Sequence, residues 1–158
     1  MITLKKGDIA PSFTLAAQTD QKISLANLKG KYVCLYFYPK DRTPGCTIQS
    51  CQFRDWNERL KEINVLVYGI NNGTKQSHQQ FASEYNFNFE LLIDIDNEVA
   101  LSYGVWGEKT MYGKKYLGIQ RSTFLIDTEG NILKIWKKAN PQRNAEDVYN
   151  FLKINKLY

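Results

Sequence analysis

The chain has 158 residues, of which 43% are hydrophobic and 23% are charged, with a formal net charge of +5. This length and composition are typical of an ordinary globular protein, and we expect a single domain over residues 1–158. The basic residues never run longer than two and are interspersed with acidic ones, which argues against nucleic-acid binding. No apolar run approaches the ~20 residues that span a bilayer, and the first residues do not resemble a secretory signal. We therefore expect a cytoplasmic protein without membrane contact.

Strand-like and helix-like segments alternate along the chain. Residues up to about Lys31 contain turn-forming clusters and indicate loops and short strands. After them we expect, in order, a strand at 32–38, a helix from about 44 to 63, a strand at 64–70, a helix at 74–85, a strand at 89–95, a short helix near 97–103, a glycine-rich loop, and a β-hairpin over 122–127 and 132–137. Asn144 can cap a last helix that runs to about Lys156.

This order of elements predicts an α/β protein. A βαβ half followed by a ββα half is typical of a thioredoxin-like fold, with a central mixed sheet flanked by helices and here preceded by an N-terminal extension. In the first long helix, apolar positions recur at steps of three and four and predict one buried stripe. Its members are Ile48, Cys51, Gln52, Trp56, Leu60 and Ile63.

Three cysteines, Cys34, Cys46 and Cys51, do not make a disulfide scaffold in a chain of this size. A closed zinc site wants four ligands, but these cysteines lack paired spacing and the chain has a single histidine, His78. We therefore expect no metal. His78 lies in a polar helical segment, and we interpret it as a surface histidine without a catalytic role.

Cys46 falls at the expected start of the first long helix. Thr43 suits the N-cap, and Pro44 suits the first helical position, where an N–H group would have no partner. Cys46 then occupies about the third position, close to free backbone N–H groups and the positive end of the helix dipole. Both favour the thiolate, the species that attacks peroxide. The alternative is a small hydrophobic residue at a helix start.

Cys51 follows Cys46 by five residues. In a regular helix this spacing separates the Cα atoms by about 8.6 Å. A disulfide needs less than ~7 Å. The pair could therefore bridge only if the first turns of the helix unwound, while a buried position on the apolar stripe remains the alternative for Cys51.

The segment 36–51 resembles the active site of a peroxiredoxin. Specifically, it is similar to the bacterioferritin-comigratory-protein or PrxQ subfamily, with the pattern Pro-x-x-x-Thr-x-x-Cys-x-x-x-x-Cys. The resemblance covers nearly the whole chain, from Gly-Asp-Ile-Ala-Pro-Ser-Phe at 7–13 to Gly-Ile-Gln-Arg-Ser-Thr-Phe-Leu-Ile-Asp at 118–127.

This resemblance implies a role for each matching residue. Cys46 would be the peroxidatic cysteine and Cys51 the resolving one. The Thr43 hydroxyl would orient the peroxide, Pro39 would shield the thiolate from water, and Arg121 would stabilise the thiolate and the developing negative charge.

Arg121 rests on the match to the Gln-Arg-Ser-Thr-Phe-Leu-Ile-Asp motif alone, because Arg42 and Arg54 lie closer to Cys46 in sequence. Cys34 lies in the expected strand at 32–38 and matches no catalytic position of the family. We interpret Cys34 as an inert core thiol.

The implied activity is that of a thiol-dependent peroxidase that reduces hydrogen peroxide and organic hydroperoxides. It would proceed through a Cys46 sulfenic acid and an intramolecular disulfide with Cys51, which thioredoxin or a similar dithiol reduces. No metal, flavin, haem or other cofactor is required, and we expect a monomer, with a dimer as the alternative. A thiol–disulfide oxidoreductase would want a Cys-x-x-Cys pair, but Thr43 lies three residues before Cys46. A non-enzymatic redox sensor or chaperone-type binding protein with the same switch remains open, and catalytic turnover would distinguish it from an enzyme.

Overall fold

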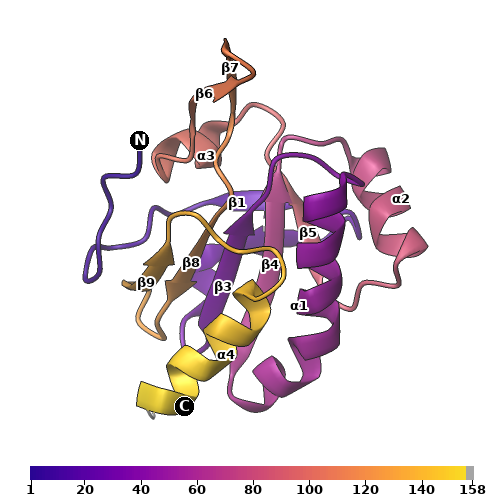
Figure 1. Cartoon of the computed structure of the whole chain (residues 1–158). Helices are drawn as coiled ribbons and strands as arrows, with labels where there is room; N and C mark the ends of the chain where they lie inside the picture. The colour runs from indigo at the N-terminus through magenta and orange to yellow at the C-terminus, as the bar shows by residue number, and fades with distance from the viewer. Residues whose placement is uncertain (156–158) are drawn as a thin grey trace.

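The computed structural model describes residues 1–155, and at its centre is a five-stranded mixed sheet in the order β5-β4-β3-β8-β9 (Figure 1). These strands are β3 (Tyr32–Phe37), β4 (Val65–Asn71), β5 (Glu90–Ile93), β8 (Ser122–Ile126) and β9 (Ile132–Trp136). Strands β3, β4 and β5 run parallel, whereas β8 pairs antiparallel with both β3 and β9. The βαβ half and the ββα half of a thioredoxin-like fold therefore meet at the pairing of β3 with β8, and the expected fold class is confirmed.

Helices and the N-terminal segment cover opposite faces of this sheet. The helices are α1 (Pro44–Glu62), α2 (Lys75–Glu84), α3 (Glu98–Ser102) and α4 (Asn144–Asn155). Figure 1 shows α1 and α4 side by side across one face, and the two helices are in contact. The N-terminal extension, with β1 (Thr14–Ala16), β2 (Lys22–Ser24) and the 3-10 helix η1 (Leu25–Leu28), packs with α3 on the other face. The expected helix end near Lys156 lies outside the described residues.

The glycine-rich segment after α3 is a β-hairpin, so the expectation of a loop is wrong. Strands β6 (Trp106–Met111) and β7 (Lys114–Ile119) pair with each other and project from the body of the protein (Figure 1). Tyr112 and Gly113 both have positive φ, 52° and 77°, as the tight turn of a two-residue hairpin requires. Most of the hairpin is exposed on both faces. It therefore lacks the alternation of apolar and polar residues by which a half-buried strand is recognised.

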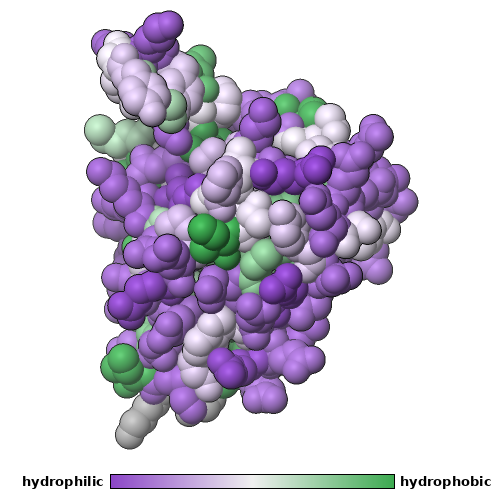
Figure 2. Space-filling view, turned by 45° about the vertical axis from the view of Figure 1, so that its right-hand side comes forward, coloured by the Kyte–Doolittle hydropathy of each residue, from purple (hydrophilic) through white to green (hydrophobic). Residues whose placement is uncertain are grey.

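The face of the molecule in Figure 2 is mostly hydrophilic, and its hydrophobic residues form small separate patches. Among residues 1–155, no helix has the length and apolar character needed to cross a bilayer.

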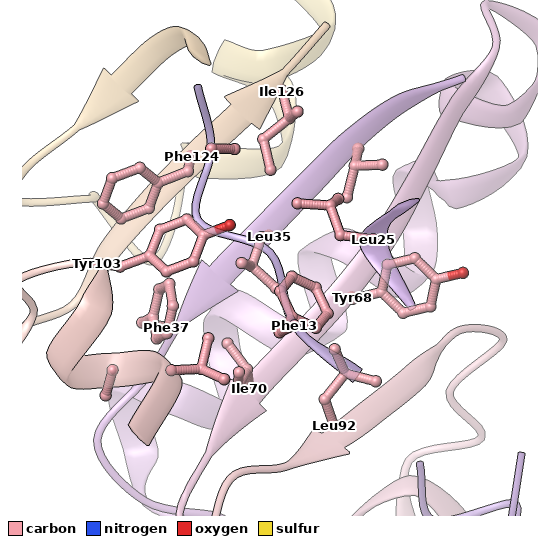
Figure 3. Packing of buried hydrophobic residues seen from close by; sticks show 14 of the residues in the cluster. Phe13, Leu25, Leu35, Phe37, Tyr68, Ile70, Leu92, Tyr103, Phe124 and Ile126 are labelled. Carbon is pink, nitrogen blue, oxygen red and sulfur yellow. The ribbon is translucent and has the colours of Figure 1, made fainter. Parts of the chain in front are cut away.

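Strand β3 is buried on both faces and joins the two hydrophobic cores. Val33, Leu35 and Phe37 point toward the N-terminal extension, and Cys34, Tyr36 and Tyr38 point toward the helices. Figure 3 shows the first core, where Leu35 and Phe37 lie among aromatic and aliphatic side chains of the neighbouring strands, of the N-terminal extension and of Tyr103 after α3. After Phe37 the chain leaves this sheet in a loop, and helix α1 begins at its end, at Pro44.

The inner face of α1 differs from the expected apolar stripe. Its buried residues are Cys46, Gln49, Ser50, Phe53, Asn57 and Leu60, whereas Ile48 is exposed and Cys51, Gln52 and Trp56 are only partly buried. Of the expected stripe, only Leu60 and Ile63 are buried. The pattern of apolar residues misplaced the stripe because three polar side chains turn inward and are hydrogen-bonded there.

Candidate active site

Cys46 occupies the third position of α1, directly after the loop that leaves β3. Thr43 stands at the N-cap position with an extended backbone, and Pro44 is the first helical residue, as the sequence predicts. The Cys46 side chain is only 1% exposed and accepts a hydrogen bond on Sγ from Arg121 Nη2 at 3.4 Å. The sulfur therefore has both the free N–H end of a helix and a guanidinium beside it, and both can stabilise negative charge that develops on it.

Arg121 reaches Cys46 from the segment between β7 and β8. The guanidinium passes close to Gly45, where an added Cβ would lie 3.0 Å from Arg121 Nη2. A glycine before Cys46 therefore leaves room for the guanidinium. Arg121 Nη1 donates a second hydrogen bond to Gln49 Oε1 at 2.7 Å. Because Cys46 and Gln49 are three residues apart on one face of α1, the planar fork of Arg121 spans both.

Gln49 connects Arg121 to a buried polar network. Its Nε2 donates to Asn144 Oδ1 at 3.1 Å, and the same oxygen accepts a hydrogen bond from Thr123 Oγ1 at 2.6 Å. The Asn144 side chain thus bonds α1 and β8 and does not cap α4, in which Asp147 N donates to the carbonyl of Arg143. Sequence reasoning did not identify Gln49, although a polar residue three positions after Cys46 shares its helical face, and it gave Asn144 the role of a helix cap only.

The Thr43 side chain does not cap α1. Its Oγ1 donates to the carbonyl oxygen of Lys40 at 2.9 Å, within the loop that joins β3 to α1. The hydroxyl proton of Thr43 is therefore engaged in a hydrogen bond within the loop, and Oγ1 keeps lone pairs that can accept a hydrogen bond from another group. Pro39 lies in the same loop and is partly buried.

Cys51 lies on the same continuous helix as Cys46, about 140° away around the helix axis. Both are free thiols, as is Cys34. Cys51 is partly buried, and burial raises the pKa of its thiol, with Arg54 acting to lower it and Asp55 to raise it further. Cys34 is fully buried on the helix side of β3, and burial raises the pKa of this thiol well above its usual range. The structure therefore brings Arg121 to Cys46 but leaves Cys51 apart from it.

His78 is not a surface residue, and that interpretation is wrong. Its side chain is fully buried, and Nδ1 lies 2.6 Å from Asp41 Oδ2. The Asp41 carboxylate also accepts hydrogen bonds from Tyr38 Oη (2.6 Å), Asn71 Nδ2 (3.2 Å) and Ser77 Oγ (2.7 Å). Burial acts to raise the pKa of Asp41, but the hydrogen bonds, led by that with His78, lower it below its usual value. The hydrophilic sequence of α2 predicts an exposed side chain at position 78. Histidine can nevertheless be buried when its ring nitrogens have hydrogen-bond partners.

The described residues contain no group of three or more His, Cys, Asp or Glu side chains that could hold a metal ion.

A helix-start thiol in contact with a guanidinium, on a thioredoxin-like sheet, defines a cysteine-based redox enzyme. The AhpC/TSA family model matches residues 6–135. Peroxiredoxin Bcp of Bacillus subtilis is 39% identical over 152 residues (96% of this chain and 97% of the relative), and Peroxiredoxin Bcp of Escherichia coli is 42% identical over 153 residues (97% and 98%). The chain belongs to the AhpC/TSA family, as a peroxiredoxin of the Bcp/PrxQ subfamily.

Solved structures agree with this assignment. A cysteine-to-serine mutant of Xylella fastidiosa PrxQ superimposes with a TM-score of 0.93 at 31% identity, covering 99% of each chain. A Xanthomonas campestris bacterioferritin comigratory protein, described for its alkyl peroxide reduction activity, gives a TM-score of 0.85 at 32% identity, covering 90% of this chain and 91% of its own. The protein is accordingly a thiol-dependent peroxidase, and its substrates are peroxides.

Proposed function

We propose that Cys46 is the peroxidatic cysteine of this enzyme. The observation that carries the proposal is the contact of 3.4 Å between Arg121 Nη2 and Cys46 Sγ at the start of α1. The sulfur attacks the terminal oxygen of the peroxide, the O–O bond breaks, and the thiol and ROOH become a sulfenic acid and ROH. Arg121 stabilises the negative charge first on sulfur and then on the leaving oxygen. Hydrogen peroxide and organic hydroperoxides are the substrates, in keeping with the alkyl peroxide activity of the Xanthomonas relative.

The loop before α1 binds and shelters the peroxide. The Thr43 hydroxyl donates its proton to the Lys40 carbonyl, so its oxygen faces a peroxide O–H group as an acceptor. This contact orients the peroxide for attack by Cys46. Pro39, which has no N–H group of its own, excludes water from the thiolate.

Cys51 then resolves the sulfenic acid. The first turns of α1 unwind, the Cys51 thiol attacks the Cys46 sulfur, and a disulfide and one water molecule form. A dithiol, thioredoxin or a similar protein, reduces this disulfide by thiol–disulfide exchange and returns both thiols. The enzyme is thus an atypical 2-Cys peroxiredoxin that forms its disulfide within one chain. We assign it to the cytoplasm, where such a reductant operates, as a monomer.

The cysteine roles are tested by intact mass after one equivalent of peroxide. We expect the wild type to lose two hydrogens and Cys51→Ser to gain one oxygen, while Cys46→Ser shows neither change. Cys34→Ser is the matched control and behaves as the wild type. Undiminished peroxide turnover by Cys46→Ser would refute the assignment. An obligatory bridge to Cys34 or between two chains would refute the role of Cys51.

Turnover separates this proposal from a redox sensor built on the same thiols. With dithiothreitol or thioredoxin as reductant, an enzyme consumes many equivalents of peroxide, whereas a sensor consumes about one. We expect sustained consumption that depends on Cys46.

A further inference from the structure

The side chain of His78 has an acceptor at each ring nitrogen. Nε2 lies 2.9 Å from the carbonyl oxygen of Leu92, which can only accept a hydrogen bond, so Nε2 carries a proton. Nδ1 lies 2.6 Å from Asp41 Oδ2. The Asp41 carboxyl is ionised at neutral pH, because its pKa is lowered, and it too can only accept. His78 is therefore fully buried, with an oxygen acceptor within hydrogen-bond distance of each ring nitrogen.

The four hydrogen-bond donors around Asp41 come from three parts of the fold: the end of β3, the end of β4 and helix α2. Tyr38 follows β3, Asn71 is the last residue of β4, and Ser77 and His78 belong to α2. The cluster is tightly packed around Gly73, where an added Cβ would lie 3.0 Å from His78 Cε1 and 3.1 Å from Asp41 Oδ2. Asp41 belongs to the loop between β3 and α1. Its carboxylate thus connects this loop to the carboxyl ends of β3 and β4 and to helix α2.

The fastened loop is the one that carries the peroxide-binding residues. Asp41 stands midway between Pro39 and Thr43. The next residue, Arg42, has a φ of 66°, a left-handed conformation that is unfavourable for a side chain of this type. Arg42 also forms an ion pair with Glu84 of α2 at 3.0 Å. The hydrogen bonds of Asp41 and the ion pair of Arg42 therefore hold the backbone of these two residues in a conformation that is unfavourable without such contacts.

A buried carboxylate such as that of Asp41 adds little to the stability of a fold. Removing a charge from water is costly, and well-packed apolar side chains often stabilise a fold as well or better. What hydrogen-bonded charges supply is a defined position, because the geometry of the carboxylate and its donors admits one arrangement. Here the defined position is that of the backbone two residues before Thr43.

We propose that Asp41 and His78 are positioning residues that hold the Pro39–Thr43 loop in place for the attack of Cys46 on peroxide. The inference rests on the proposed role of Cys46 and extends it to two residues that do not touch the reacting atoms. The pair keeps the loop attached to β3, β4 and α2, so that Thr43 remains in register with the sulfur. When α1 unwinds, the loop stays in place and the backbone opens after Arg42.

Two substitutions of His78 separate its two hydrogen bonds. In His78→Asn, the side-chain amide nitrogen can take the place of Nδ1 and donate to Asp41. In His78→Gln, the amide nitrogen can take the place of Nε2 and donate only to Leu92. We expect oxidation of Cys46 to slow by about tenfold to a hundredfold in His78→Gln, because a small misplacement of a reacting group has an effect of this size. The rate in His78→Asn should lie clearly closer to that of the wild type.

The measurement follows the two half-reactions separately, by rapid quenching and mass analysis. Sulfenic acid formation is timed in a Cys51→Ser background, and disulfide formation is timed at saturating peroxide with Cys51 present. We expect the first step to slow in His78→Gln and the second to be unchanged or faster. Ser77→Ala removes one donor from a partly exposed site and should slow the first step by a smaller factor. Gln80→Ala, exposed on the same helix, is the control and should change neither step.

Equal rates of Cys46 oxidation in His78→Asn and His78→Gln would overturn the proposal, as would an equal loss in both half-reactions. If His78→Gln does not fold, an unchanged first step in Ser77→Ala overturns it. These failures are distinct from failure of the proposed function. In that case Cys46→Ser would retain turnover, whereas here Cys46→Ser would be inactive and His78 would have no effect on oxidation.

Discussion

The Arg121 guanidinium makes the contact on which the proposed peroxidase chemistry depends most directly. It donates from Nη2 to Cys46 Sγ and from Nη1 to Gln49 Oε1. Arg121→Met removes both hydrogen bonds and the charge but keeps a side chain that can fill the space. Arg121→Lys keeps a charge but, as a compact point charge, cannot reproduce the planar fork that spans the two partners.

The size of the effect follows from the type of bond that is lost. A hydrogen bond to a charged group contributes about 1.5–3 kcal/mol. If this free energy is expressed in the transition state, where each 1.36 kcal/mol is tenfold in rate, Arg121→Met slows Cys46 oxidation by about 10- to 150-fold. Arg121→Lys should lie between this variant and the wild type. Loss of the donor also leaves the buried Gln49 Oε1 unpaired, which destabilises the fold by about 1–3 kcal/mol.

The assay is the second-order rate constant for sulfenic acid formation with hydrogen peroxide at pH 7, in a Cys51→Ser background. Urea denaturation of each variant shows whether the protein remains folded under the conditions of the assay. Lys138→Met is the matched control, because Lys138 is an exposed basic residue in the same surface hollow as Arg121. Its charge is screened by salt, and the rate should change less than twofold. A rate for Arg121→Met within twofold of the wild type would refute the role of Arg121.

Three further predictions follow from individual sites. Gly69→Ala should lower the free energy of unfolding by about 1–3 kcal/mol, because its Cβ would lie 2.7 Å from the ring of Tyr36; an unchanged urea midpoint would contradict this packing. The pKa of Asp41 is lowered below its usual 3.8, so its contribution to stability is present above that value and is lost as the pH falls through the folded pKa. Asp41→Asn should therefore flatten the acid decline of the urea midpoint, and an equally steep decline would exclude this contribution. Asp55→Asn should lower the pKa of Cys51 and move its alkylation profile to lower pH in a Cys46→Ser background; an unshifted profile would show that Asp55 does not act on this thiol.

Local sequence signals predicted the secondary structure around Cys46 well. The Thr43-Pro44-Gly45-Cys46 segment begins a helix at Pro44, after a strand that is buried on both faces. These features depend on neighbours within a few residues, such as the missing N–H group of proline. Arg121 had no such signal. It lies 75 residues from Cys46 along the chain, and only a match to family motifs identified it before the pairing of β3 with β8 was known.

Sequence reasoning failed where polar residues are buried. Periodicity considers only apolar positions. It therefore predicted that α1 buries Cys51 and not Gln49, and that His78 is exposed, whereas Gln49 and His78 are both buried. Each of these polar groups is inside because a partner from a distant segment satisfies it: Gln49 through Arg121, and His78 through Asp41. Such pairing is a tertiary property, and hydropathy alone does not reveal it.

The polar inner face of α1 also bears on how the helix could be ordered for peroxide attack and unwound for resolution. Over its first turns, the buried side chains after Cys46 are Gln49 and Ser50, held by hydrogen bonds to Arg121 and to Tyr36 Oη at 2.8 Å. Water can replace such bonds when a segment opens, so each contributes only about 0.5–1.5 kcal/mol net, or up to about 3 kcal/mol where a charge is involved. Further along, Phe53 is fully buried and stacks on Tyr36 with ring centroids 4.5 Å apart. Exposing such a side chain would cost about 1.5–3 kcal/mol with no replacement from water. In the proposed cycle, the boundary between the segment that opens and the helix that stays would therefore fall just before Phe53, and the opening segment would contain both Cys46 and Cys51.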